Sequence, residues 1–149
     1  MFTTAQTEII EQAIALLEQS FRTQELAFTS PDAVMEFCRL SISHFEHEVF
    51  SVLFLDSQHK LIEFKTMFRG TIDSASVYPR EVAKEALQLN AAAVIFTHNH
   101  PSGLCEPSQS DLRLTTRLID ALNLFDIRVL DHIIVSKINS ISFAERGLL

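Results

Sequence analysis

The sequence predicts an α/β domain, in which helices pack on a mixed β-sheet. Segments with the composition of β-strands alternate along the chain with segments of helical periodicity, an order typical of such domains. Residues 92–97 (AAVIFT) form a continuous apolar run, as expected for a strand buried on both faces, and residues 127–136 are predicted as a second buried strand. With 149 residues, the chain is long enough to bury one hydrophobic core.

Two helices and a hairpin are expected in the N-terminal half. Apolar residues recur at helical spacing between residues 5 and 21. After a connecting segment, Ser30 and Pro31 suit the N-cap and the first position of a second helix. Residues 48–56 and 61–68 are rich in β-branched and aromatic residues and flank a short turn, which predicts a β-hairpin.

A third helix is expected to begin at Pro79, after a loop or short strand, and to end near Asn90. The first buried strand then leads into a polar loop. Beyond this loop, residues 110–125 have helical periodicity, and a last hairpin is expected around residues 137–142, after the second buried strand.

Composition narrows the classes of function. Nineteen acidic and twelve basic residues give a net charge of −7, which disfavours binding to nucleic acid or anionic lipid. Cys38 and Cys105 form no C-x-x-C motif, so neither a disulfide framework nor a cysteine-based zinc finger is predicted. Because the sequence shows neither a signal peptide nor an apolar run of membrane length, we expect a cytoplasmic protein. Its oligomeric state is left open.

Two histidines stand where the first buried strand ends, in the stretch FTHNHPSGLCEPSQSD. Side chains two positions apart point to the same face of an extended chain, so His98 and His100 can converge on one point. The carboxyl end of a strand is a usual place for a site in an α/β sheet. A catalytic zinc ion takes three protein ligands and keeps one position open.

Asp111, at the start of the next helix, is the candidate third ligand. A His, His, Asp set of nitrogen and oxygen donors suits Zn²⁺. Ser108 and Asp111 also fit a capping box, in which the carboxylate only caps its own helix. The spacing alone leaves both interpretations open.

The run HNHPSGLCEPSQSD resembles the JAMM signature of the JAB1/MPN metallohydrolases, in the variety found in the RadC family of bacterial proteins. The resemblance extends from about Glu48 to the C-terminus, through EVFSVLFLDSQ, GTIDSASVYPREV, VLDHIIV and SFAERG. It implies the MPN fold, a mixed sheet flanked by helices that is similar to the fold of cytidine deaminases. We accordingly expect a RadC-like MPN domain over residues 28–149, preceded by an N-terminal helical extension over residues 1–27.

The resemblance also implies a zinc-dependent peptidase or isopeptidase, with a peptide or protein as its partner. Zn²⁺ would be bound by His98, His100 and Asp111, with water in the fourth position. Glu48 matches the general base of the family. Ser102 matches the serine that hydrogen-bonds the oxyanion formed when water attacks a carbonyl group.

Several neighbouring residues have competing interpretations. Glu46 is two positions from Glu48 and is its rival as the general base. Cys105 lies in the same loop and could be a fourth ligand that silences the site, although a packing residue is the simpler interpretation. Asp131 and His132 resemble a carboxylate–histidine pair, which would either support the metal ligands or serve as a structural pair at the end of a strand.

Two other functions fit the sequence less well. In a non-catalytic MPN-fold binding module or DNA-repair accessory protein, the metal would be structural or vestigial. The joint presence of the three liganding residues and Ser102 favours an enzyme instead. A metal-dependent nuclease with a two-metal mechanism would need a second cluster of carboxylates, which the sequence does not offer.

Overall fold

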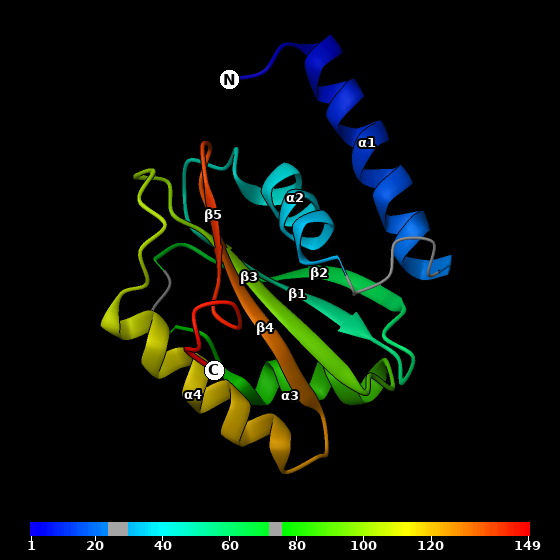
Figure 1. The fold of residues 1–149 in the computed structure, drawn as a ribbon, viewed down its shortest axis with the longest axis vertical. Helices are drawn as coiled ribbons and strands as arrows, with labels where there is room; N and C mark the ends of the chain where they lie inside the picture. The colour runs from blue at the N-terminus through cyan, green and yellow to red at the C-terminus, as the bar shows by residue number, and fades with distance from the viewer. Residues whose placement is uncertain (24–29, 72–75) are drawn as a thin grey trace.

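A computed structural model describes residues 1–23, 30–71 and 76–149. These residues form a five-stranded mixed sheet flanked by helices, which confirms the predicted α/β class (Figure 1). The connector at residues 24–29 and part of the predicted loop, residues 72–75, lie outside the described residues. The elements in chain order are α1 (Thr4–Thr23), α2 (Pro31–Ile42), β1 (Val49–Leu55), β2 (Leu61–Arg69), α3 (Pro79–Gln88), β3 (Ala93–Asn99), α4 (Gln109–Asn123), β4 (Arg128–Val135) and β5 (Ser140–Ser142).

The strands are ordered β2-β1-β3-β4-β5 across the sheet. β1 pairs antiparallel with β2, as the predicted hairpin requires, and it also pairs antiparallel with β3. β3 and β4 are parallel, and α4 makes the crossover between them. β5 adds to β4 as the predicted final hairpin. This order places β3 in the middle of the sheet, so its C-terminal end is enclosed by neighbours.

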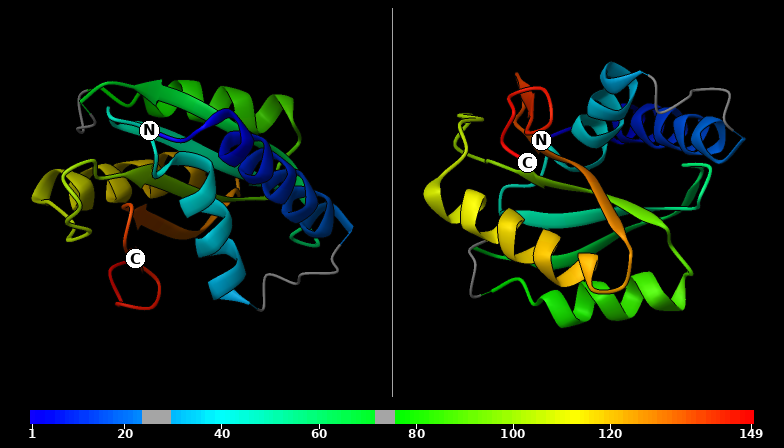
Figure 2. Two further views of the ribbon diagram at one scale, coloured as in Figure 1. Left: turned by 90° about the horizontal axis from the view of Figure 1, so that it is seen from above. Right: turned by 60° about the horizontal axis from the view of Figure 1, so that its bottom comes forward.

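The alternation of side chains along the strands builds a separate core on each face of the sheet. Helices α3 and α4 cover one face, and α1 and α2 cover the other (Figure 2). The core under α3 and α4 includes Phe50, Phe54, Phe96, Leu114 and Leu118. The core under α2 includes Phe21, Phe37, Leu53, Ile95 and Ile133.

Local sequence signals set the ends of two helices. Ser30 and Pro31 stand at the N-cap and first position of α2 as predicted, although the Ser30 side chain forms no capping hydrogen bond. Asn90 follows α3 with a φ of 55°. This left-handed conformation is one that asparagine tolerates well, and it stops the helix where the sequence predicts.

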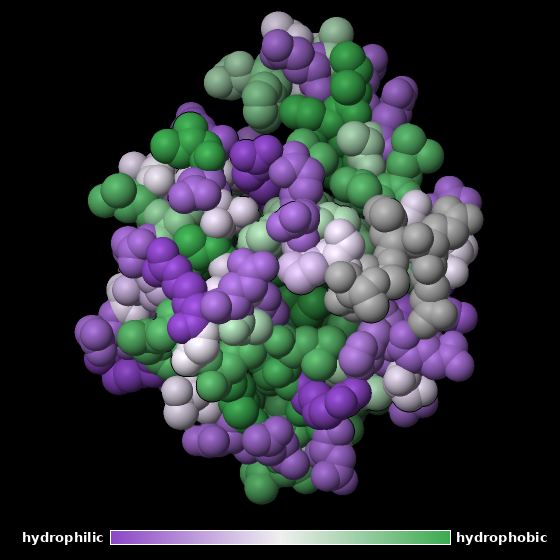
Figure 3. All heavy atoms as spheres, in the orientation of Figure 1, coloured by the Kyte–Doolittle hydropathy of each residue, from purple (hydrophilic) through white to green (hydrophobic). Residues whose placement is uncertain are grey.

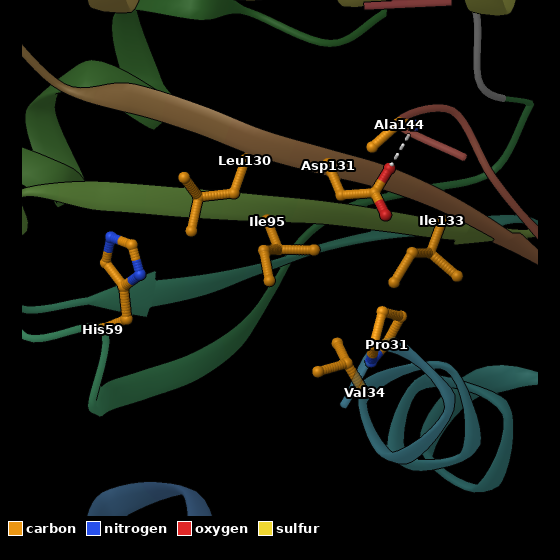
Figure 4. Close-up of a pocket in the computed structure, with 8 residues that line it drawn as sticks. All are labelled: Pro31, Val34, His59, Ile95, Leu130, Asp131, Ile133 and Ala144. Atoms are coloured by element: carbon orange, nitrogen blue, oxygen red, sulfur yellow. Dashed lines mark hydrogen bonds between the residues drawn. The ribbon is translucent and has the colours of Figure 1, made fainter. Parts of the chain in front are cut away.

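A hollow of about 290 Å³ lies between α2 and the sheet. Pro31 and Val34 of α2 lie across it from Ile95, Leu130 and Ile133 of the sheet (Figure 4). Figure 3 shows apolar side chains gathered on the lower part of this view of the molecule, bordered by polar ones. Because Ile95 and Ile133 belong to the α2 core, the sheet itself separates this hollow from α4.

The inner face of α4 supplies a test of this packing. Leu118 is fully buried, whereas Leu124, just past the end of the helix, is 81% exposed. Leu118→Ala should lower the free energy of unfolding by about 2–5 kcal/mol, because it removes buried contacts and leaves a cavity. The same change at Leu124 should lower it by less than about 0.5 kcal/mol. Denaturant unfolding measures both, and equal losses would contradict the packing of α4.

Candidate metal centre

The C-terminal end of β3 turns sharply into the loop that leads to α4. The Gly103 N–H donates to the His100 carbonyl at 3.0 Å, and Gly103 has a φ of 93°, in the left-handed region that favours glycine. The same turn fixes the ring of His100, whose Nδ1 lies 2.7 Å from the carbonyl oxygen of Leu104. Since a carbonyl can only accept, Nδ1 carries the proton and Nε2 is the nitrogen that faces the strand end.

Three side chains converge at this point. The Nε2 atoms of His98 and His100 lie 3.0 Å apart. Oδ1 of Asp111 lies 3.2 Å from His98 Nε2, and Oδ2 of Asp111 lies 3.3 Å from His100 Nε2. Within residues 1–23, 30–71 and 76–149, no other set of three His, Cys, Asp or Glu side chains brings its ligand atoms within 4.8 Å of one another. The structure therefore brings the three predicted residues together.

The spacing of these atoms fits a small tetrahedral cation. At a zinc–nitrogen distance of about 2.0 Å, tetrahedral ligand atoms lie about 3.3 Å apart. The two Nε2 atoms are 3.0 Å apart, and each is 3.2 or 3.3 Å from one oxygen of the Asp111 carboxylate, so these separations are close to this value. Two imidazoles and a carboxylate are also donors that zinc accepts readily. The group could therefore hold a metal ion.

Asp111 fills both of the roles that its sequence context suggests. Its Oδ2 accepts a hydrogen bond from the Ser108 N–H at 2.8 Å, and the Ser108 hydroxyl accepts one from the Asp111 N–H at 3.0 Å. This is a complete capping box at the start of α4. A carboxylate has about four acceptor positions, so capping leaves capacity for the histidines and fixes the direction in which Asp111 points.

The charges of the three residues are coupled. Burial raises the pKa of the Asp111 carboxyl, but its hydrogen bonds with the rings of His100 and His98 outweigh burial and hold the pKa well below its usual range. Burial lowers the pKa of His100, but Asp111, the Leu104 carbonyl and the charge of Glu48 together raise it on balance. Asp111 is thus anionic, the state in which a carboxylate binds a cation.

Asn99, between the two histidines, fixes the segment that precedes β1. Its side chain is fully buried, and its Oδ1 accepts from the Val49 N–H at 2.7 Å. Its Nδ2 donates to the carbonyls of Phe45 and His47 at 3.2 and 3.0 Å. These three bonds clamp residues 45–49 against the end of β3.

The clamp holds the backbone on both sides of Glu48, the candidate general base. Glu48 is half-buried, and its charge contributes to the raised pKa of His100. Glu46 is exposed and lines a separate hollow with His44, His47 and other residues near the N-terminus. The charge of Glu48 thus acts on His100, and the role of general base stays a prediction for both residues.

Ser102 and Cys105 differ in their surroundings. Ser102 is exposed on the turn after His100, and its predicted role as an oxyanion donor stays a prediction. Cys105 is buried in a small apolar cluster with Ile134, Ile141 and Phe143. Its thiol donates to the carbonyl of Asn139 at 3.2 Å. This contact supports the packing interpretation of Cys105.

The side chains of Asp131 and His132 do not pair, because they lie on opposite faces of β4, but His132 does contact a candidate metal ligand, as the first of the two interpretations expects. Asp131 accepts hydrogen bonds from the Ser142 hydroxyl and the Ala144 N–H, which tie down the C-terminal segment. His132 faces α4, with Nε2 2.8 Å from His98 Nδ1 and Nδ1 2.6 Å from the Thr115 hydroxyl. Burial and the nearby His98 hold the pKa of His132 well below its usual range, so its ring is neutral.

Sequence reasoning missed two residues of this site. Thr115 is four positions after Asp111 and so lies on the same face of α4, which was an available signal. Asn99 belongs to no motif of its own, and the residues that it binds are about fifty positions away. Only the pairing of β1 with β3 brings them together.

Fold and site together define a metallohydrolase-type α/β domain with a candidate metal centre at the end of its central strand. The family model of the RadC-like JAB domain matches residues 28–148, and the chain belongs to this family. None of the described helices has the length and hydropathy that a membrane span requires.

The chain is similar to bacterial proteins named UPF0758. It is 60% identical over 141 residues to one from Vibrio cholerae, which covers 95% of this chain and 88% of that protein. A second Vibrio cholerae protein is 54% identical over 144 residues, covering 97% and 90%. One from Chromohalobacter salexigens is 59% identical over 123 residues, covering 83% of this chain but 55% of that protein. The chain thus spans most of the first two relatives and about half of the third.

Cys105→Ser should leave metal binding unchanged, because the thiol packs in an apolar cluster and donates to the Asn139 carbonyl. The measurement is metal content per chain in protein offered zinc and then desalted, with His98→Ala as the control that should lose the metal. Loss of metal from a Cys105→Ser protein that still melts cooperatively would show that the thiol is a ligand.

Proposed function

We propose that the protein is a zinc-dependent hydrolase, a peptidase or isopeptidase that cleaves an amide bond in a peptide or protein substrate. The observation that carries this proposal is the convergence of His98, His100 and Asp111. The two Nε2 atoms lie 3.0 Å apart, and each lies 3.2 to 3.3 Å from one of the two oxygens of the Asp111 carboxylate. Membership of the RadC-like JAB domain family supports it, because the fold is of the metallohydrolase type.

Zinc fits the donor set best, with His98, His100 and Asp111 as its protein ligands. When bound, zinc supplies a Lewis acid that polarises a carbonyl group and lowers the pKa of water. With three protein ligands, a fourth position is left for the reacting groups, as in other catalytic zinc sites.

Glu48 is the proposed general base. Its charge acts on His100, and the Asn99 clamp fixes the backbone on both sides of it. In this role Glu48 takes a proton from the attacking water and passes it to the leaving amine. Ser102, on the exposed turn after His100, is the proposed donor to the oxyanion that develops on the substrate carbonyl.

Access and charge favour a peptide or protein substrate. The His98 and Asp111 side chains are 1% and 4% exposed, but that of His100 is 14% exposed and Ser102 lies at the surface beside it. The centre therefore opens to solvent on the side of this turn. A net charge of −7 repels polyanions, so nucleic acid is the less suitable partner. Two unpaired cysteines fit a cytoplasmic location.

Metal content is the direct test. Protein purified without added metal should contain about one zinc ion per chain, and His100→Ala should contain none. His47→Ala is the matched control, because His47 is exposed and lies outside the convergent group. Chelation should lower the melting temperature of the wild type, since a ligand at a hundredfold excess over its Kd adds about 2.7 kcal/mol to folding. A wild type that takes up no zinc would contradict the proposal and favour a non-catalytic binding module.

Glu48→Gln and Glu46→Gln form a matched pair for the chemical step. Glu48→Gln should reduce cleavage by at least about 100-fold, because amide nitrogen cannot accept the proton, and it should keep its zinc. Glu46→Gln should cleave at the wild-type rate. Cleavage of a peptide library, followed by mass spectrometry, measures both variants. The reverse pattern would assign the base to Glu46.

A further inference from the structure

We propose that His132 is a positioning residue of the candidate metal centre, which holds the imidazole of His98 in the tautomer whose Nε2 lone pair faces the metal position. The inference rests on the proposed function, because His98 needs this tautomer only if it binds a metal. It assigns a role to a third histidine that is not itself a ligand.

A chain of hydrogen bonds links His132 to two of the proposed ligands. Its Nε2 lies 2.8 Å from Nδ1 of His98, and its Nδ1 lies 2.6 Å from the hydroxyl of Thr115. The Thr115 hydroxyl in turn donates to the carbonyl oxygen of Asp111 at 2.8 Å. The chain therefore begins at the ring of one ligand on β3 and ends at the backbone of another on α4.

The number of protons in this chain fixes its direction. The Thr115 hydroxyl has one hydrogen, which goes to the Asp111 carbonyl because a carbonyl can only accept. The hydroxyl oxygen must then accept from Nδ1–H of His132. A neutral ring with its proton on Nδ1 has a lone pair on Nε2, so His132 accepts from Nδ1–H of His98. The Nε2 of His98 keeps its lone pair, on the side of His100 and Asp111.

The surroundings of His132 favour the neutral ring that this direction requires. Its ring centroid lies 4.7 Å from that of Phe143, 5.8 Å from Phe50 and 5.9 Å from Phe96. The side chain is fully buried, and the neighbouring Asp131 points to the opposite face of β4. An unpaired charge among apolar rings is strongly disfavoured.

His132 competes with Asp111 for the proton of His98. Asp111 Oδ1 lies 3.2 Å from His98 Nε2, close enough to accept a hydrogen bond from it. A proton on Nε2 would stand where the metal must bind. By accepting from Nδ1–H, His132 favours the other tautomer, since its removal would leave a buried N–H without an acceptor.

His100 shows the same arrangement with a different acceptor. Its Nδ1–H is held by the carbonyl of Leu104 at 2.7 Å, so the Nε2 lone pair of His100 also faces the centre. In both proposed ligands, Nδ1, the nitrogen turned away from the centre, donates a hydrogen bond to an acceptor. For His98 that acceptor is a side chain, which can be replaced without changing the backbone.

Zinc affinity and histidine tautomer are the two measurements. Zinc affinity comes from competition with a chelator, and the tautomer of His98 comes from ¹⁵N NMR of the imidazole nitrogens in metal-free protein at alkaline pH. His132→Phe keeps a planar ring beside Phe143 but removes the acceptor. It should weaken zinc binding by about 10- to 100-fold and move the proton of His98 from Nδ1 toward Nε2.

Three further variants separate positioning from packing. His132→Gln supplies an amide oxygen as acceptor and should recover part of the zinc affinity. Thr115→Val removes the hydroxyl that orients His132 and should weaken zinc binding less than His132→Phe. Thr116→Val is the matched control, because the adjacent hydroxyl donates to the Leu112 carbonyl on the exposed side of α4 and should change neither measurement.

The outcomes distinguish this inference from the proposed function. Unchanged zinc affinity and tautomer in His132→Phe, with only a lower melting temperature, would overturn the positioning role while zinc binding stands. If the wild type bound no zinc, the proposed function would fail and the spectra alone would decide. A proton on Nδ1 of wild-type His98 supports the role of His132, and a proton on Nε2 overturns it. Should His132→Phe not fold, Thr115→Val compared with Thr116→Val provides the test: weaker zinc binding in Thr115→Val alone supports the role of His132, and equal affinities overturn it.

Discussion

A network of five buried polar side chains around the end of β3 finds its partners inside the domain, and it shapes the structure around them. His98, Asn99, Asp111, Thr115 and His132 are at most 3% exposed. A buried polar group without a partner costs about 1–3 kcal/mol, a large share of the stability of a small domain. All five are hydrogen-bonded, and their bonds connect β3 to β4, to α4 and to the segment before β1. The network therefore fixes how these elements meet as well as the site itself.

Successive side chains of β3 point to opposite faces of the sheet, so the strand end positions different groups on each face. His98 points to the α4 face, where it meets Asp111 and His132. Asn99, one position later, serves the other face and clamps the segment that carries Glu48. One strand end thus positions a candidate metal-binding group and a candidate base at the same time. Both are set by a central strand and not by a free loop, which gives the precision that catalytic geometry requires.

The strands of the central sheet and the placement of the two candidate histidine ligands were predictable, because the relevant sequence signals are local. Continuous apolar runs marked β3 and β4, and two-residue spacing placed His98 and His100 on one face. The contact between His98 and His132 spans 34 positions and depends on the parallel pairing of β3 with β4, which no local pattern specifies. The predicted Asp131–His132 pair failed for a reason visible in the sequence. Neighbours on a strand point to opposite faces, so adjacency along the chain does not bring their side chains together.

The hydrogen bonds around the centre also explain why it suits a cation. In the proposed tautomers, Nδ1 of each ring donates to an acceptor, and the Nε2 atoms of His98 and His100, which lie 3.0 Å apart, turn their lone pairs toward the metal position. An anionic carboxylate, that of Asp111, stands within 3.3 Å of both. Two nitrogen lone pairs and an anionic carboxylate at such distances repel one another in a buried setting, where little water is present to screen them. A divalent cation at their centre would attract all of them and so outweigh this mutual repulsion. A buried third histidine and a helix cap orient these atoms toward one point, which is the organisation of a metal site. An apolar core would fill the same space with less electrostatic repulsion.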